Sequence, residues 1–557
     1  MNNLSYWRSK ADIDANLKKQ LDQYSEDELH DAFYTRLNFG TAGMRGLLGP
    51  GPNRINLYTV ARANIGYGKY LLSLGGEIVK VAIAHDNRHQ SKELASVCAK
   101  TLAQLGIESY LFEDLRPTPE LSFAVRELQA TGGIVITASH NPPEYNGYKV
   151  YDHTGRQLIP EEIDEVIKYI EEIDDELSID FSVTKQQEKL IHTLDETIDR
   201  QYKDAVLSIQ LRPEQNKDDF LLVFSPQHGT AEPLMTEIFD EAGYHYVLVE
   251  EQAFSNPDFV NTATPNPEDK ASYDLALEYA KKHQADIILV TDPDADRMGI
   301  VVAHQDGYKY LTGNQGGAIL LKYIFETREE KDLMPNDPVI FNTIVTSDVG
   351  EALAKHHGVR TEKTLTGFKF IGEKIEAMKD SRDYVFGYEE SYGYLLAPFV
   401  RDKDALQACL MLAEAGAYYK SLKKTLVDVL YEVFAEVGAY EDQQVSLTLS
   451  GAQGVAQIQA IMANFRTMDL TEIAGQKVLY FEDYLNQQRQ DASGLSLLEF
   501  PSADVLKYGL EDGSWIAIRP SGTEPKCKFY YCVRGDTLDM ATEKLSVYKD
   551  FMAQLME

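Results

Sequence analysis

Cysteine is scarce in this chain. Only Cys98, Cys409, Cys527 and Cys532 occur in 557 residues, and no two of them form a C-x-x-C pair. So few thiols argue against a disulfide framework and against a structural zinc site. Long apolar runs are also missing: no stretch approaches the roughly 20 residues of a membrane span, and the N-terminal segment MNNLSYWRSKADIDANLKKQ lacks the apolar core of a signal peptide. These absences predict a cytoplasmic protein with no membrane partner.

Positive charge is in deficit. The chain has 54 Lys and Arg against 88 Asp and Glu, a formal net charge of −34. Such a surface repels the phosphates of nucleic acids and of anionic membranes, so we expect no nucleic-acid partner. It also repels a phosphorylated metabolite at long range. A phosphate site in this protein must therefore be built locally, from a few Arg, Lys and backbone N–H groups.

Short runs rich in Val and Ile alternate with longer helical patterns through most of the chain. The expected strands lie at 77–86, 132–139, 220–226, 246–250, 285–292 and 338–345. Helical patterns such as 91–106 and 271–284 separate them. This alternation predicts α/β layers around buried, mixed sheets.

The chain is long enough for several domains, at the usual allowance of about 100–200 residues each. We expect four. The first three are α/β units and the last is a mixed α/β unit at the end of the chain. The predicted ranges are 1–205, 206–312, 313–440 and 441–557.

The segment VTDPDADR (290–297) places Asp292, Asp294 and Asp296 at alternate positions directly after a buried-type strand. In an extended segment, which Pro293 favours, the three carboxylates share one side. Crowded carboxylates repel unless a cation lies among them, and hard oxygen ligands indicate magnesium. An EF-hand fails here, because Arg297 replaces the required Gly and Ala303 the required Glu. The pattern predicts a metal site, with a solvated acidic turn as the alternative.

ITASHNPPEYNGYK (136–149) follows another buried-type strand, which places Ser139 at the carboxyl end of a sheet, where such sheets bind ligands. Ser139 and His140 are neighbours, so within an extended segment they do not easily form a nucleophile–base pair. An ordinary polar turn remains the alternative for this loop.

Two later segments carry further polar groups. In FGYEESYGY (386–394), Glu389 and Ser391 share one side if the segment is extended, and such a pair suits two adjacent sugar hydroxyls. In IRPSGTEPKCK (518–528), Arg519 offers a fork of donors for phosphate, and Ser521, Gly522 and Thr523 suit an anion-binding nest. A polar edge strand and a plain Pro-Gly turn are the respective alternatives.

Three more cations lie beside glycines or at a strand end. Arg45 occurs in the Gly-rich FGTAGMRG (39–46), Arg88 follows a strand in HDNRHQS (85–91), and Lys369 lies in TGFKFIG (366–372). Each is a candidate phosphate ligand, and none is persuasive singly.

Taken together, the loops TASHNP (137–142), DPDADR (292–297), YEES (388–391) and RPSGTEP (519–525) resemble those of the α-D-phosphohexomutase superfamily, in the same order along nearly the whole chain. The resemblance implies four domains around a central cleft: three related α/β domains with mixed sheets and a smaller C-terminal α+β domain. Tyr388 replaces a Gly that many members have before the Glu. The form GYEESYGY is similar to a subgroup of bacterial α-phosphoglucomutases, phosphopentomutases and glucose 1,6-bisphosphate synthases.

The resemblance also implies roles for single residues. Ser139 becomes the phosphoryl carrier and, with the three Asp residues, a ligand of one Mg²⁺ per chain. Lys149 and Arg45 assist proton transfer. The implied substrate-binding residues are Arg88, His140, Arg297, Gly367, Lys369, Glu389, Ser391, Arg519, Ser521, Gly522 and Thr523.

The implied activity interconverts α-D-glucose 1-phosphate and glucose 6-phosphate through glucose 1,6-bisphosphate, in a monomer or weak homodimer. Phosphopentomutase and phosphomannomutase activities are the alternatives within the family. A phosphatase that hydrolyses its phosphoserine, and a non-catalytic sugar-phosphate or cation-binding protein, are the alternatives outside it.

Overall fold

The computed structural model describes residues 3–10, 12–40, 43–76, 78–449, 451–520 and 526–556. The chain divides into two compact units. Unit 1 comprises Met1–Tyr310, Ile371–Ser381 and Gly393–Tyr418, and unit 2 comprises Leu311–Phe370, Arg382–Tyr392 and Tyr419–Glu557.

Unit 1 begins with three short helices and a mixed sheet. Its first elements are α1 (Asn3–Ser9), α2 (Ala15–Leu21), α3 (Glu26–Phe33), β1 (Met44–Leu47), α4 (Leu57–Ser73), β2 (Lys80–His85), α5 (Ser91–Gln104), β3 (Glu108–Phe112), α6 (Thr118–Glu127), β4 (Gly132–Ile136), β5 (Tyr145–Asp152), α7 (Pro160–Glu171), β6 (Ile191–Leu194) and α8 (Thr197–Leu207). The strand order is β1-β5-β4-β2-β3-β6. Strands β4, β2, β3 and β6 are mutually parallel, whereas β5 runs antiparallel to β4 and to β1.

Two adjacent glycines in β4 show how closely helices cover both faces of this sheet. A Cβ on Gly132 would lie 2.0 Å from the hydroxyl of Tyr67 in α4, and one on Gly133 would lie 2.7 Å from Val125 in α6. Because successive residues of a strand face opposite sides, α4 and α6 pack on opposite faces. The carboxyl end of β4, which leads to Ser139, is thereby held rigidly.

A second sheet of unit 1 has the order β11-β10-β9-β7-β8. Its elements are β7 (Leu221–Ser225), α9 (Leu234–Ala242), β8 (His245–Leu248), α10 (Asp274–His283), β9 (Ile287–Thr291), β10 (Met298–His304) and β11 (Gly307–Tyr310). Every residue of β9 is buried, as its sequence IILVT predicts. Strand β9 runs parallel to β7 and antiparallel to β10, so the segment between β9 and β10 is a tight reversal that contains the three Asp residues. Strand β15 (Gly393–Leu395) and most of α14 (Ala405–Ser421) complete the unit.

Unit 2 contains a parallel sheet in which β12 lies between β13 and β14. The elements of this part are α11 (Gly313–Glu330), β12 (Val339–Thr343), α12 (Val349–His356), β13 (Arg360–Thr364), α13 (Phe368–Glu376), β14 (Tyr384–Glu389) and α15 (Leu426–Val437). Helix α13 begins in unit 2 and continues into unit 1.

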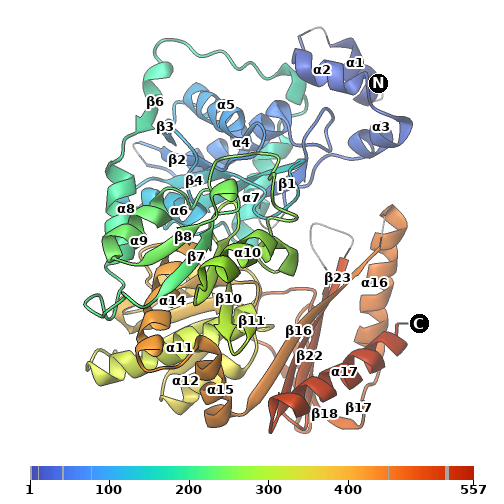
Figure 1. Ribbon diagram of the computed structural model, residues 1–557. Coiled ribbons are helices and arrows are strands. Elements are labelled where there is room, and N and C mark those ends of the chain that lie inside the picture. The colour runs from blue at the N-terminus through green and yellow to red at the C-terminus, as the bar shows by residue number, and fades with distance from the viewer. Residues whose placement is uncertain are drawn as a thin grey trace. The chain divides into compact units, whose positions relative to one another are not determined.

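The last part of unit 2 is an antiparallel sheet with the order β16-β23-β22-β21-β18-β19-β20. Its elements are β16 (Ala439–Thr448), α16 (Gly451–Thr467), β17 (Glu472–Ile473), β18 (Gln476–Asp483), β19 (Gln488–Asp491), β20 (Gly494–Leu497), β21 (Leu506–Leu510), β22 (Trp515–Pro520), β23 (Lys526–Gly535) and α17 (Leu538–Gln554). Side chains from α16 and α17 share one core with this sheet, and Figure 1 shows both helices beside it.

The six expected strands all exist, with ends two or three residues shorter in places, as do the helices at 91–104 and 274–283. Three α/β sheets and an antiparallel C-terminal sheet with helices confirm the predicted fold class. Among the residues described, no helix combines the length and the apolar character needed to cross a membrane.

Candidate active site

Ser139 lies three residues beyond the end of β4, with its backbone in the left-handed region at φ +52°. Its side chain is 3% exposed, and its Oγ donates to Oδ2 of Asp292 over 2.7 Å. The extended segment, on which Ser139 and His140 were not expected to pair, is wrong here. The left-handed turn brings Nδ1 of His140 within 3.2 Å of the same Oγ, which an extended segment would prevent.

The three Asp side chains converge. Oxygens of Asp292, Asp294 and Asp296 lie within 4.8 Å of one another, and all three residues are at most 2% exposed. The expected extended segment is wrong: the loop is a turn with Ala295 at φ +54°, and Oδ1 of Asp292 accepts the N–H groups of Asp296 and Arg297. Turn geometry, and not strand alternation, brings the carboxylates together.

Two lysines balance part of this negative charge. Nζ of Lys149 lies 2.8 Å from Asp294 and 3.5 Å from Asp296, and Nζ of Lys403 lies 3.0 Å from Asp296. Burial lowers the pKa of Lys149, but Asp294 and Asp296 raise it, and the net pKa is raised. Burial and then the two neighbouring carboxylates raise the pKa of Asp292 well above its usual value. Ionising Asp292 beside two other buried carboxylates is therefore costly, and a bound cation would reduce that cost.

The donor set fits a small divalent cation. Oδ1 of Asp294 and Oδ1 of Asp296 are buried and have no hydrogen-bond partner among the described residues. Such orphaned oxygens are costly unless something cationic binds them. Hard carboxylate oxygens beside a serine hydroxyl are the ligands that Mg²⁺ prefers.

Three other segments hold the Asp loop in place. Thr118 at the start of α6 donates its Oγ1 to Asp294 over 3.0 Å, and its N–H donates to the carbonyl of the same residue. The N–H of Thr230 donates to the carbonyl of Pro293, and the N–H of Ala405 to that of Ala295. The loop thus has little freedom to rearrange.

Arg88 is placed differently from its expected role. Its side chain is fully buried, ion-paired with Asp86 at 3.2 Å. Its terminal nitrogens donate to four backbone carbonyls, those of Ser139, Asn141, Pro142 and Tyr145. All four terminal N–H groups are used, so the prediction that Arg88 binds substrate is corrected: it fixes the shape of the Ser139 loop.

Arg45 and Arg297 lie near the same cluster in unit 1. Arg45 is on β1 and donates to Oδ1 of Asn141 over 2.8 Å, so it reaches the Ser139 loop from the neighbouring strand. Arg297 pairs with Glu268 and approaches Asp296 at 3.8 Å. Both remain candidates for binding an anion.

Unit 2 holds the predicted sugar-binding residues. Glu389 ends β14 and is 4% exposed, and its Oε1 accepts the N–H of Gly367 over 2.7 Å. Gly367 has φ +119°, a value that other residues rarely adopt, and Lys369 follows at the start of α13. The expected extended segment over Glu389 and Ser391 is wrong: β14 stops at Glu389, and Ser391 lies in a turn before Tyr392 at φ +65°.

Arg519 is on β22, opposite Lys528 of β23, and is half-buried. It makes no ion pair with the described residues, so the predicted alternative of a structural acid partner finds no support there. Ser521, Gly522 and Thr523 lie outside the described residues.

Sequence reasoning missed two residues of this cluster. Lys403 occurs in RDKD, an unremarkable charged run more than 100 residues from the Asp loop, and no spacing rule links the two. Thr118 had a weak signal, because it follows the carboxyl end of β3, the same edge of the sheet as Ser139.

Comparison with known proteins assigns the chain to a family. The phosphoglucomutase/phosphomannomutase alpha/beta/alpha domains I, II and III match residues 36–177, 200–307 and 312–437, and the C-terminal domain of that family matches 447–541. The chain belongs to the phosphoglucomutase/phosphomannomutase family.

Its relatives include a phosphoglucomutase of Staphylococcus aureus (strain MRSA252), 38% identical over 97% of each chain. One of Staphylococcus epidermidis (strain ATCC 12228 / FDA PCI 1200) is 38% identical over 96% of this chain and 97% of the other. Among solved structures, parafusin (phosphoglucomutase) of Paramecium aligns with a TM-score of 0.67 and 18% identity, covering 92% of this chain and 94% of that one. A family protein of Burkholderia thailandensis aligns with a TM-score of 0.65 and 17% identity, covering 93% and 96%.

Proposed function

We propose that this member of the phosphoglucomutase/phosphomannomutase family is a phosphoglucomutase. It interconverts α-D-glucose 1-phosphate and glucose 6-phosphate through a phosphoserine at Ser139 and a glucose 1,6-bisphosphate intermediate. The observation that carries the proposal is the 2.7 Å hydrogen bond from Ser139 to an Asp cluster with two orphaned oxygens. The full-length similarity to staphylococcal phosphoglucomutases supports glucose as the sugar.

Asp292, Asp294, Asp296 and the phosphorylated Ser139 would hold one Mg²⁺. When bound, this ion supplies a positive charge that stabilises the transferring phosphoryl group and the serine oxygen that it leaves.

Residues of the protein orient the reacting groups and handle the proton. A sugar hydroxyl attacks the phosphorus on Ser139, the bond from phosphorus to Oγ breaks, and the hydroxyl proton must leave. Lys149 and Arg45 are the candidates for handling that proton and charge, because Lys149 contacts two of the Asp residues and Arg45 reaches the Ser139 loop. Arg88 keeps the loop carbonyls in place, so that Oγ stays directed at Asp292.

We propose that a second group of residues recognises the sugar and the phosphate that is not reacting. Glu389, ordered by the N–H of Gly367, suits sugar hydroxyls, with Ser391 and Lys369 nearby in sequence. Arg519, with Ser521, Gly522 and Thr523, suits the remote phosphate. His140 and Arg297 complete the proposed set of substrate ligands.

We also propose that the chain folds into four domains, at residues 1–205, 206–312, 313–440 and 441–557. We propose further that the protein is a monomer or a weak homodimer and that it is located in the cytoplasm. Glucose 1,6-bisphosphate is proposed as intermediate and activator.

A coupled assay for glucose 6-phosphate tests the function. With α-glucose 1-phosphate as substrate, we expect turnover that requires Mg²⁺ and increases when glucose 1,6-bisphosphate is added. Parallel assays with mannose 1-phosphate and ribose 1-phosphate test the sugar, and glucose should give the highest kcat/KM. Release of inorganic phosphate without isomerised sugar would contradict the proposal and indicate a phosphatase.

A further inference from the structure

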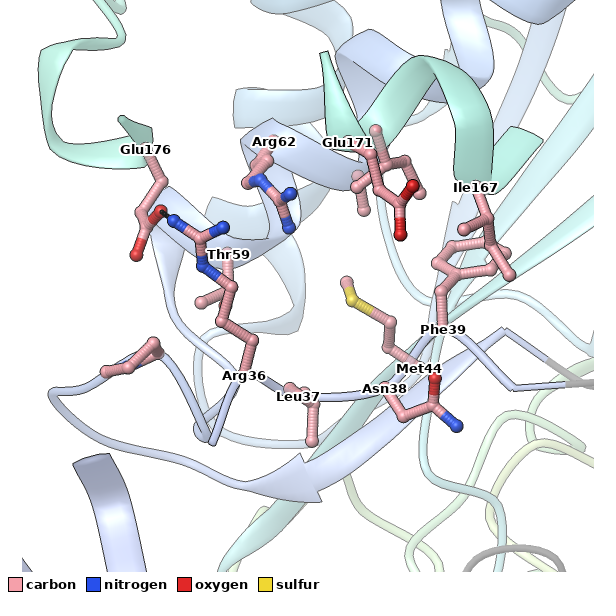
Figure 2. Close-up of a pocket in the computed structure, with 13 residues that line it drawn as sticks. Arg36, Leu37, Asn38, Phe39, Met44, Thr59, Arg62, Ile167, Glu171 and Glu176 are labelled. Carbon is pink, nitrogen blue, oxygen red and sulfur yellow. Dashed lines mark hydrogen bonds and ion pairs between the residues drawn. The ribbon is translucent and has the colours of Figure 1, made fainter. Parts of the chain in front are cut away.

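A cavity of about 230 Å³ lies in unit 1 between the segment that precedes β1, helix α4 and helix α7 (Figure 2). Its lining residues include Arg36, Phe39, Met44, Arg62, Ile170 and Glu171. None of them belongs to the set proposed for the phosphoryl-transfer reaction.

The floor of the cavity is apolar. Phe39, Met44, Ala63 and Ile170 are each at most 6% exposed, and Ile167 packs beside them. A cavity of about 150 Å³ with such a lining accepts benzene. This one therefore has room for an aliphatic or aromatic body of somewhat larger size.

One guanidinium in the wall is only partly used. Nε of Arg62 donates to the carbonyl of Ile173 over 2.9 Å, and its two terminal nitrogens have no partner among the described residues. The pKa of Arg62 is lowered by burial and then by the charge of Arg36. Arg36 itself is occupied, with Glu176 at 3.3 Å and the carbonyl of Asp174 at 2.9 Å. The two terminal nitrogens of Arg62 are thus donors with no acceptor among the residues that the structure describes.

A carboxylate in the same cavity is also unused. The carboxylate of Glu171, the last residue of α7, makes no hydrogen bond or ion pair with any described residue. Figure 2 shows its carboxylate and the Arg62 guanidinium both turned toward the space above Met44. No ion pair joins the two, so a ligand has access to both charges.

We propose that this cavity binds a small zwitterion with an apolar body, of which an apolar α-amino acid is the simplest form. The carboxylate of the ligand accepts from the terminal nitrogens of Arg62, and its ammonium group donates to Glu171. Its side chain covers Phe39, Met44 and Ile170. Small-ligand sites commonly have this composition, a mostly apolar wall with a few polar groups that fix orientation.

The cavity adjoins the strand that carries Arg45. Met44 and Arg45 are consecutive in β1, so their side chains face opposite sides of it. Met44 lines the cavity, whereas Arg45 donates to Asn141 in the Ser139 loop. A ligand in the cavity therefore lies behind a strand that contacts the proposed active site.

The test uses L-leucine and two analogues that each lack one charge, 4-methylpentanoate and 3-methylbutylamine. Calorimetry or ligand-observed NMR on the full chain should show that leucine binds most tightly. The expected preference is about fivefold over 4-methylpentanoate, since Glu171 is exposed, and about tenfold over the amine. No detectable binding of leucine, or equal binding of all three, would overturn the proposal.

Matched variants separate the two contacts. Arg62→Met should remove the preference for leucine over the amine, and Glu171→Gln should remove the preference over 4-methylpentanoate. Lys69→Met and Glu172→Gln are the controls, because Lys69 lies on α4, Glu172 directly follows α7, and the two pair with each other outside the cavity. Unchanged preferences in folded Arg62→Met and Glu171→Gln would reject the site.

A measurement on the unaltered protein covers the case in which a variant fails to fold. Hydrogen exchange with saturating leucine should slow at amides of residues 36–40, 59–63 and 167–173, and 3-methylbutylamine at the same concentration should have a smaller effect. Protection elsewhere but not in these segments would contradict the proposal.

Discussion

Ser139 is the residue on which the proposed chemistry depends. Its Oγ is the only atom proposed to carry the phosphoryl group. The Ser139→Ala variant should lose mutase turnover by at least about 10³-fold, because no other nucleophile replaces the hydroxyl. Its melting temperature should stay close to that of the unaltered protein, since the loop is held by Arg88 and backbone contacts.

The coupled assay and a thermal melt together check this prediction. Ser208→Ala, an exposed serine at the end of α8, is the control and should retain full turnover. Substantial turnover in Ser139→Ala would remove this residue from the role of carrier.

Arg519 has no ion pair with the described residues, so its loss should affect ligand binding more than folding. We expect Arg519→Ala to raise KM for glucose 1-phosphate by about tenfold or more, the effect of losing hydrogen bonds to a charged phosphate. The melting temperature should change little. Steady-state kinetics and thermal melts provide both readouts, with the exposed Lys477→Ala as control. A large drop in melting temperature with unchanged kinetics would indicate a structural role.

The types and positions of single residues in the sequence were enough to predict part of the candidate active site. Ser139 and the three Asp residues could be found because each follows a strand whose buried pattern is plain in the sequence. Lys403 could not be found, since its approach to Asp296 depends on how a distant charged loop folds back. Arg88 shows the opposite error: a cation at a strand end suggested a ligand contact, but its donors are used by four carbonyls.

Loop geometry between elements controls how the Asp residues converge. Gly229 illustrates the packing around that loop, because a Cβ there would lie 2.4 Å from the Cα of Pro293. We expect Gly229→Ala to displace the loop, with a loss of about 1–3 kcal/mol in the free energy of unfolding. Turnover should fall at least about tenfold, since small misplacements at a reacting centre are costly.

Thermal melts and the coupled assay compare this variant with Gly307→Ala. Gly307 has open space around its Cβ position and an ordinary φ, so that substitution should be nearly neutral. Equal behaviour of the two variants would show that the contact with Pro293 has no functional importance.

Strands were predicted well and turns poorly. Buried β strands follow from short runs of Val, Ile and Leu, which is why all six expected strands exist. Ser139, Ala295 and Tyr392 each lie in a turn and have a left-handed backbone conformation. Ser, Ala and Tyr rarely adopt that conformation, so the sequence does not predict it. The extended geometry expected for these three loops was therefore wrong, although their chemistry was read from the same residues.

On the scale of the whole molecule, the net charge of −34 requires local sites for anions. The structure is consistent with that requirement: Lys149 and Lys403 contact the Asp cluster in unit 1, and Arg519 is on the C-terminal sheet of unit 2. The similarity to members of the family extends over nearly the whole chain. The exact domain boundaries remain predictions.

Stability should depend on pH through Asp442, which joins β16 to the start of α11 within unit 2. Its carboxylate accepts from Thr312 and Asn314, yet burial raises its pKa to about 6. A raised pKa means that the folded state binds a proton more readily than the unfolded state between pH 4 and 6. The contribution of this group to the free energy of unfolding therefore falls as the pH rises through that range, and stays low above it.

Thermal melts of Asp442→Asn and the unaltered protein between pH 4.5 and 7.5 check this sign. The stability of the variant relative to the unaltered protein should increase from pH 4.5 to about 6.5 and then level off. Asp469→Asn, at an exposed position, should show no such trend. A relative stability that decreases with rising pH would contradict the prediction.

The most direct measurement is the phosphorylation state of the enzyme during turnover. Full-length protein incubated with Mg²⁺ and glucose 1,6-bisphosphate, then quenched and analysed by intact mass and peptide mass spectrometry, should carry one phosphoryl group on Ser139. Addition of excess glucose 6-phosphate should remove it and return glucose 1,6-bisphosphate. Active enzyme with no phosphoryl group on Ser139, or with one on another residue, would contradict the account.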